Sequence, residues 1–253
     1  MTPIDQQVVH LCSGDDQSSL QALLATYTPP WHAIIDMLTA ATASNNVGLV
    51  RYLLSLYPDI HLAETPVRKA TYLGSIQLFD AFYQRDPSVV SMIFEKQGPP
   101  LSVALMSSRP LEFISYLLSH GADPNQEPEF HPYALAAAVF GYRGSTEVLD
   151  LLLASGARVQ RMGALHMCAY KGYTDVARYL LQHGVTPETD TPEHYYHCDA
   201  LALHCAIAKG DLGMVELLLQ HGADKSRRDK EGKTAFDIAE EKGDVQILGL
   251  LKE

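Results

Sequence analysis

The residues with the clearest chemical potential lie in one short run, His194-Tyr195-Tyr196-His197-Cys198. Imidazole and thiolate groups are zinc ligands, so a His-x-x-His-Cys spacing could hold a metal ion. A structural zinc site needs a fourth ligand, and the sequence has no second Cys/His pair nearby. We therefore expect no metal site. Two interpretations of the run stay open: an aromatic contact patch that responds to pH, or a solvated loop.

No motif for covalent or phosphate chemistry accompanies this run. The Ser-Gly pairs at 13–14 and 155–156 lack the Gly-x-Ser-x-Gly context of a nucleophile elbow. The chain also lacks a glycine-rich loop that could cradle phosphate. Cys198 has a basic neighbour in sequence, His197, but one neighbour is weak evidence for a reactive thiol. We expect no catalytic residue and no cofactor.

The composition argues against two classes of partner. Apolar residues make up 47% of the 253 residues, so the chain should fold. The net charge is −11, with only 19 Lys and Arg residues. The most basic stretch, residues 225–233, is interrupted by Asp229 and Glu231. Nucleic acid and anionic membranes are therefore poor partners for this chain.

Targeting signals and membrane spans are not visible in the sequence. Residues 1–14 lack the basic start and apolar core of a secretory signal. No apolar run approaches the 18 residues that a spanning helix needs. The four cysteines show no framework spacing, which favours reduced thiols. We expect a cytoplasmic or nuclear monomer that is not in a membrane.

The elements that would position any site repeat along the chain. Segments 163–184, 201–224 and 234–251 align with a period near 33 residues, which is typical of a stacked repeat architecture. The glycines predicted to lie in the loops between paired helices, Gly141, Gly172, Gly210 and Gly243, are 31, 38 and 33 residues apart. A repeat array usually presents a surface for binding.

The clearest unit begins at Thr65 and predicts a pair of helices. The Thr65 hydroxyl can cap the first helix, and Pro66 suits the first helical position. Gly74 can end that helix in a left-handed conformation. Apolar residues at helical spacing follow in 76–82, which predicts the second helix.

This pattern resembles the ankyrin repeat family. The matching residues are Thr65-Pro66, the Leu-His pairs at 165–166 and 203–204, the loop glycines, the Leu triplets, the Gly-Ala-Asp ends, and Asp229, Gly232 and Thr234 in the final turn. The resemblance implies an all-α solenoid of stacked antiparallel helix pairs with projecting hairpin-like fingers, in one array over residues 1–253. The expected units are about 3–30, 31–60, 65–96, 99–130, 131–160, 161–194, 199–230 and 232–253.

The resemblance also implies where a partner would bind. In this family the first helix of each unit and the fingertips line a concave face, and the two residues before each loop glycine point into it. Those positions are usually polar, but here units three to six place apolar residues there: Tyr72, Leu73, Met106, Phe140 and Tyr170. An exposed apolar strip with a polar rim marks a binding site. The alternative is that these aromatic rings pack on neighbouring helices and tighten the stack.

The longest finger adds a second group of candidates. The interval from Gly172 to Gly210 is five residues over the period, and the excess falls in residues 187–200. If adjacent fingers stack, this segment lies near its neighbours and forms a cluster of aromatic, His and Arg side chains. The members of this cluster are His131, Tyr133, Arg161, Tyr195, Tyr196 and His197.

Two functions from different classes follow. The leading hypothesis is a protein-interaction scaffold that grips a partner protein in an apolar concave groove over units three to seven, either alone or as the recruiting arm of an enzyme complex. The alternative is a small apolar ligand, or an isomerase- or cyclase-type reaction, in a pocket closed by the 187–200 finger. Because no catalytic motif is present, we expect no enzyme.

Overall fold

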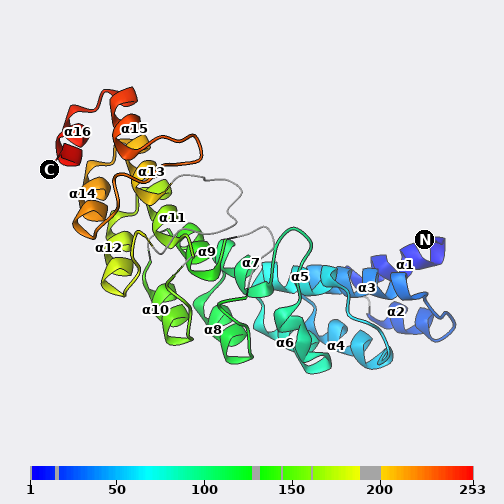
Figure 1. Cartoon of the computed structure of the whole chain (residues 1–253). Helices are drawn as coiled ribbons and strands as arrows, with labels where there is room; N and C mark the ends of the chain where they lie inside the picture. Colours follow the sequence, from blue (N-terminus) through cyan, green and yellow to red (C-terminus); the bar gives the residue numbers. More distant parts are fainter. Residues whose placement is uncertain are drawn as a thin grey trace. The chain divides into compact units, whose positions relative to one another are not determined.

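The structure, a computed structural model, describes residues 2–14, 17–126, 132–143, 145–160, 162–188 and 201–252. The named elements in these residues are all helices, and one isolated antiparallel β-bridge joins Phe94 and Gly98. The chain forms two compact units, Met1–Ala122 and Asp123–Glu253, and each is a stack of helix pairs (Figure 1). The predicted all-α fold of stacked helix pairs is confirmed.

In the first unit, odd-numbered and even-numbered helices form separate layers (Figure 1). Its elements are α1 (Pro3–Cys12), α2 (Gln17–Leu24), α3 (Trp31–Ala43), α4 (Val47–Leu56), α5 (Glu64–Leu73), α6 (Ile76–Arg85), the 3-10 helix η1 (Pro87–Ser91), α7 (Pro100–Met106) and α8 (Leu111–Ser119). Helix α3 contacts α1 and α5, and α5 contacts α7, while each even-numbered helix contacts the odd-numbered helix before it. We call the odd-numbered helices inner and the even-numbered helices outer.

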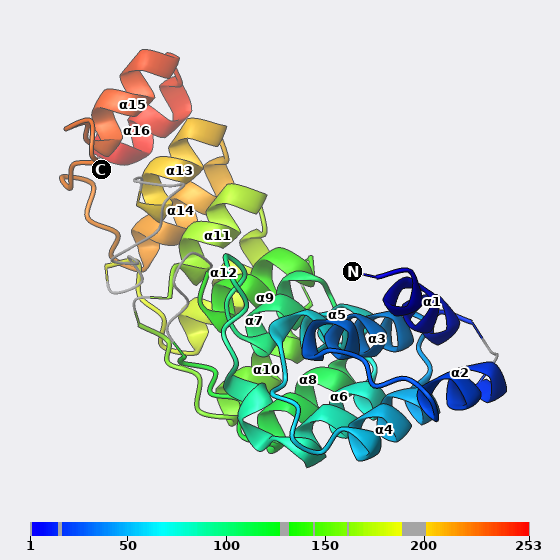
Figure 2. The ribbon, with the colours of Figure 1, turned by 90° about the vertical axis from the view of Figure 1, so that its right-hand side faces the viewer.

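The second unit repeats this arrangement. Its helices are α9 (Ala134–Gly141), α10 (Glu147–Ala154), α11 (Ala164–Lys171), α12 (Thr174–Gln182), α13 (Ala202–Lys209), α14 (Leu212–Gln220), α15 (Ala235–Lys242) and α16 (Val245–Lys252). The inner helices α9, α11, α13 and α15 contact one another in that order, and Figure 2 shows this succession. The outer helices α12, α14 and α16 contact one another likewise.

The inner helices α7, α9, α11 and α13 are mostly buried, because neighbouring inner helices and their own outer helices cover them. Every residue of α9 except Phe140 is buried, and its Ala-rich sequence lets the neighbouring helices approach closely. The outer helices are amphipathic and bury one face. In the first unit, Phe79 of α6 and Phe113 of α8 meet edge to face, with ring centroids 5.7 Å apart.

The same pair of contacts, a tyrosine–aspartate hydrogen bond and a tyrosine–histidine stack, occurs on the outer helices of both units. Tyr116 of α8 donates its hydroxyl to Asp80 of α6 at 3.1 Å and stacks on His120. In the second unit, Tyr179 of α12 donates to Asp150 of α10 and stacks on His183 in the same way. Burial, and then the hydrogen bond to Asp150, raises the pKa of Tyr179 to about 12, so the hydroxyl stays protonated at neutral pH.

Left-handed residues end the inner helices, but they are not always glycine. Gly74, Gly172, Gly210 and Gly243 are left-handed C-caps, as the sequence predicts. The prediction for Gly141 is wrong, since it lies inside α9 and Arg143 takes the positive φ of 48°. After α7, whose loop lacks glycine, Ser108 takes a φ of 53°.

The start of α5 also differs from the sequence prediction. The helix begins at Glu64, so Thr65 and Pro66 lie within its first turn and Ala63 is the N-cap. Glu64 instead pairs with Arg68 of the same helix at 3.2 Å and accepts a hydrogen bond from the Glu95 N–H at 2.8 Å. The start of this helix is therefore held through a carboxylate rather than through a hydroxyl cap.

Replacing Gly74 by alanine should cost more stability than replacing Gly172. Both glycines have a positive φ, 65° and 76°, that costs an alanine about 1–2 kcal/mol. At Gly74 the new Cβ would also lie 3.1 Å from Cδ of Arg109 and from Cδ of Pro110, whereas at Gly172 its nearest neighbour is 3.9 Å away. Urea unfolding followed by circular dichroism measures both losses. An equal or smaller loss for Gly74→Ala would contradict this packing.

Candidate functional site

The predicted apolar positions lie at the C-terminal ends of the inner helices and remain accessible. Tyr72 and Leu73 end α5 with exposed fractions of 41% and 40%. Phe140 of α9 and Tyr170 of α11 are 37% and 46% exposed. Met106, the last residue of α7, is half-buried. In α7, α9 and α11 the residues before the last turn are buried, so burial of these three helices stops in the last turn.

In the first unit, hydrogen bonds hold Tyr72 in place from two sides. Its hydroxyl donates to Oε1 of Gln97 at 3.0 Å, in the turn closed by the Phe94–Gly98 bridge. Its carbonyl accepts a hydrogen bond from Nη1 of Arg109 at 2.9 Å. We call Tyr72, Leu73 and Met106 the α5–α7 patch. The fixed Tyr72 side chain gives this patch a rigid aromatic member.

Arg109 joins the ends of two neighbouring inner helices. Its Nε donates to the carbonyl of Ser107, the C-cap of α7, at 2.9 Å, and its Nη1 reaches the end of α5 at Tyr72. A guanidinium suits this role because its donors are fixed in a planar fork. It also places a positive charge where two helix dipoles end, which is favourable. The left-handed conformation in this loop is taken by Ser108, and Arg109 adds the hydrogen bonds to the two helix ends.

In the second unit, lysines and aromatic rings alternate across the helix ends. Nζ of Lys171 lies 4.1 Å from the ring centroid of Phe140 and 5.4 Å from that of Tyr170. Nζ of Lys209, at the end of α13, lies 5.1 Å from the Tyr170 centroid. Each such contact stabilises an exposed pair by about 0.5–1 kcal/mol. We call Phe140, Tyr170, Lys171 and Lys209 the aromatic–lysine row.

The predicted site residues separate into three groups. The structure places Tyr72, Leu73 and Met106 together at the ends of α5 and α7, and Phe140 and Tyr170 together at the ends of α9 and α11. Tyr133 is the N-cap of α9, about 10 Å along that helix from Phe140. The rest lie outside the described residues: His131, Arg161, Tyr195, Tyr196 and His197.

Two functional features were missed from the sequence. The contacts of Lys171 with Phe140 and of Lys209 with Tyr170 join residues 31 and 39 positions apart, which no local pattern reveals. The Arg109 bridge was also missed, although the absence of a loop glycine before Pro110 was a visible signal. The Tyr-x-x-x-His spacing at 116–120 and 179–183 would have indicated the stacked pairs on the outer helices.

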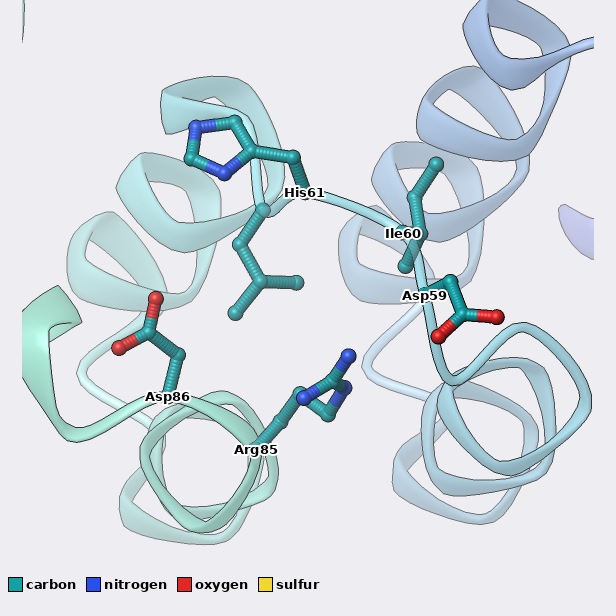
Figure 3. A pocket seen from close by; sticks show the side chains of 6 residues that line it. Asp59, Ile60, His61, Arg85 and Asp86 are labelled. Atoms are coloured by element: carbon teal, nitrogen blue, oxygen red, sulfur yellow. The ribbon is translucent and has the colours of Figure 1, made fainter.

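A separate depression lies on the first unit between the α4–α5 loop and the end of α6. Its volume is about 270 Å³, and its lining residues are Asp59, Ile60, His61, Leu62, Arg85 and Asp86. Figure 3 shows Arg85 and Asp86 facing the 59–62 loop. Hydrogen bonds from Ser88, and then the nearby His61 and Arg85, lower the pKa of Asp86. This mixed-charge, solvent-open surface does not have the apolar lining of a typical ligand pocket.

Neither a metal site nor a membrane span is present in the part of the chain that the structure describes. Those residues contain no group of three or more His, Cys, Asp or Glu side chains arranged to hold a metal ion. The His-x-x-His-Cys run lies outside them, so the absence of a metal there stays a prediction. None of the helices in the described segments is long and apolar enough to cross a bilayer.

Comparison with known proteins identifies a family over residues 101–253, which is more than half of the chain. The profile described as "Ankyrin repeats (3 copies)" matches residues 101–192, 133–229 and 188–253. A relative, the transient receptor potential cation channel subfamily A member 1 homolog of Caenorhabditis elegans, is 29% identical over 185 residues, which are 60% of this chain and 15% of that protein. Human ankyrin repeat and SOCS box protein 6 is 40% identical over 79 residues, 31% of this chain and 18% of that protein.

A solved structure has the same fold. The crystal structure of the human ASB11 ankyrin repeat domain aligns with a TM-score of 0.64 and 22% sequence identity, covering 85% of this chain and 97% of that one. The chain spans only 15%, 18% and 17% of the length of three curated relatives that it matches. These comparisons agree with the resemblance read from the sequence.

The Arg109 bridge predicts that Arg109→Ala destabilises the first unit. The substitution removes charge-assisted hydrogen bonds to the carbonyls of Ser107 and Tyr72, and we expect a loss of about 1–2 kcal/mol because the side chain is partly exposed. Arg85→Ala, at an exposed arginine, is the control and should cost less than about 0.5 kcal/mol. Urea unfolding measures both, and equal losses would show that Arg109 is not a bridge.

Proposed function

Because this chain belongs to the ankyrin repeat family, we propose that it is a protein-binding module whose contact surface is formed by the ends of its inner helices. Repeats of this kind are generally protein-interaction modules, and stacked repeats create extended binding surfaces. The predicted groove over units three to seven includes residues of both compact units. We therefore argue the contribution of each unit by itself.

The observation that carries this proposal is where the exposed apolar side chains lie. The described residues include nine large hydrophobic side chains that are exposed, and four of them occupy inner-helix ends: Tyr72, Leu73, Phe140 and Tyr170. Scattered exposed apolar residues are normal, but recurrence at one repeat position is a pattern that a binding surface explains.

Packing alone explains these residues less well. Phe140 and Tyr170 contact lysines, yet their exposed fractions are 37% and 46%, so they are not buried within the helix stack. Aromatic side chains give a partner a large contact area at a low cost in ordering entropy. Their pre-positioning by Lys171 and Lys209 lowers that cost further.

Several finer expectations are kept as predictions. A monomer in the cytoplasm or nucleus, with no nucleic-acid partner and no enzymatic activity, remains what the composition and motifs favour. The alternative, a ligand pocket or an isomerase-type site, depends on the 187–200 finger, of which residues 189–200 lie outside the described part of the chain. No specific observation favours that alternative, so it is not developed.

The proposal predicts that Phe140→Ala with Tyr170→Ala weakens capture of a partner without unfolding the protein. Wild-type and variant proteins, immobilised at equal density, would capture partners from cells, and quantitative mass spectrometry would rank the proteins that depend on these rings. For the partner so identified, we expect the affinity to fall by at least about tenfold, because aromatic anchors dominate interface energies.

A matched control separates a surface effect from general loss of exposed apolar area. Leu56 and Val245 lie on outer helices and are 42% and 80% exposed, so Leu56→Ala with Val245→Ala removes apolar surface away from the inner-helix ends. Thermal unfolding checks that both double variants fold. If the control loses the same partner to the same degree, or if the loss follows unfolding, the proposal fails.

A further inference from the structure

The second unit carries a line of lysines at its inner-helix ends. Lys171, Lys209 and Lys242 are the last residues of α11, α13 and α15, and each is followed by a left-handed glycine. Helix α13 contacts both α11 and α15 (Figure 2). Packed helices lie about 8–10 Å apart, so the three ammonium groups are carried on helix ends that span about 20 Å.

These lysines make no ion pair within the described residues, although acidic residues are in excess. The chain has 30 Asp and Glu residues against 19 Lys and Arg. Lys233, by contrast, pairs with Glu231 at 3.2 Å and with Glu241 at 2.9 Å. In three consecutive repeats, the lysine at the inner-helix end therefore has no carboxylate partner among the described residues, although the chain is rich in carboxylates.

Three acidic residues close to these lysines in sequence have other partners. Asp211 caps α14 by accepting a hydrogen bond from the Met214 N–H at 3.0 Å. Asp244 accepts one from the Ile247 N–H at 3.1 Å, at the start of α16. One oxygen of each aspartate is therefore engaged at a helix N-terminus. Glu241, next to Lys242, pairs with Lys233 at 2.9 Å. None of these three carboxylates forms an ion pair with Lys171, Lys209 or Lys242 among the described residues.

The helix dipole does not account for this line by itself. A lysine at a helix C-terminus is stabilised by about 0.3–1 kcal/mol in any helix. The other inner helices gain the same benefit from a lysine, yet α3, α5, α7 and α9 end on Ala43, Leu73, Met106 and Gly141. The lysines are confined to three successive inner-helix ends of the second unit, and two of them, Lys171 and Lys209, are held over the rings of Phe140 and Tyr170.

From this juxtaposition we propose that the bound partner segment is an extended acidic peptide. Its carboxylates pair with Lys171, Lys209 and Lys242, and an apolar side chain rests on Phe140 and Tyr170. An extended strand advances about 3.3 Å per residue, so helix ends about 10 Å apart match Asp or Glu at every third residue. This inference rests on the proposed function and specifies the chemistry of its partner.

A peptide-display selection on the full chain tests this composition directly. Random peptides would be selected on the wild-type protein, and one enriched peptide would then be titrated by fluorescence anisotropy. We expect enriched peptides to carry acidic residues at three-residue intervals beside one apolar residue. Their affinity should fall severalfold between 50 and 300 mM salt, since exposed charge pairs are screened.

Matched substitutions locate the contact. Lys171→Gln with Lys209→Gln should weaken the peptide about tenfold, and Phe140→Ala with Tyr170→Ala should weaken it at least as much. Lys69→Gln with Lys225→Gln removes two exposed lysines elsewhere and should change the affinity less than twofold. Circular dichroism confirms that each variant is folded.

The outcomes separate this inference from the proposed function. Peptides that are lost in the aromatic variant but show no acidic enrichment, and that the lysine variant still binds, would overturn the acidic segment and leave the protein-binding proposal standing. Enriched peptides that the aromatic variant binds unchanged would overturn both. Single-stranded DNA that competes at equal charge concentration would show a general polyanion site and would also overturn the inference.

Discussion

Burial of the inner helices between their neighbours is the interaction on which every other feature of this protein depends. An isolated helix shorter than about 12 residues is marginal in water, and the inner helix α9 has only 8 residues. Its seven buried residues are Ala134–Val139 and Gly141, and they form a helix because α11 and α10 cover them. Each repeat is therefore stable through its neighbours rather than through its own sequence.

This dependence explains why function would concentrate at the helix ends. Residues in the middle of an inner helix are fixed by packing on several sides, so they are not free to vary with a partner. The last turn extends past that packing, and there Tyr72, Phe140 and Tyr170 stay exposed. Cation–π contacts and the Arg109 bridge hold these ends in defined positions, so a partner would meet a largely pre-formed surface.

The repeat pattern predicted the helix pairs well because it reports burial, which has a clear period in sequence. It predicted the positions of Gly74, Gly172, Gly210 and Gly243, since few other residues adopt their conformation cheaply. It failed at Gly141 because Arg143 takes the left-handed position instead. Sequence alone could not show this, because arginine has no preference for a positive φ that would mark position 143.

The candidate site was only partly predictable for a different reason. The exposure of apolar residues could be predicted from their place before each loop, and Phe140 and Tyr170 are exposed in the last turns of α9 and α11. The contact of Lys171 with Phe140 depends on how one helix end approaches the next, a long-range geometry that spacing does not encode. Tyr133 is the N-cap of α9, but the other members of its predicted cluster lie outside the described residues.

Site-specific photo-crosslinking tests the central claim, that a protein partner binds the inner-helix ends, most directly. A photoreactive residue at Ala208, which is exposed beside Lys209, would be compared with the same residue at Gln182, which is exposed on the outer helix α12. The account predicts a covalent adduct with the partner from position 208 and little or none from position 182. An adduct formed from position 182 alone would contradict it.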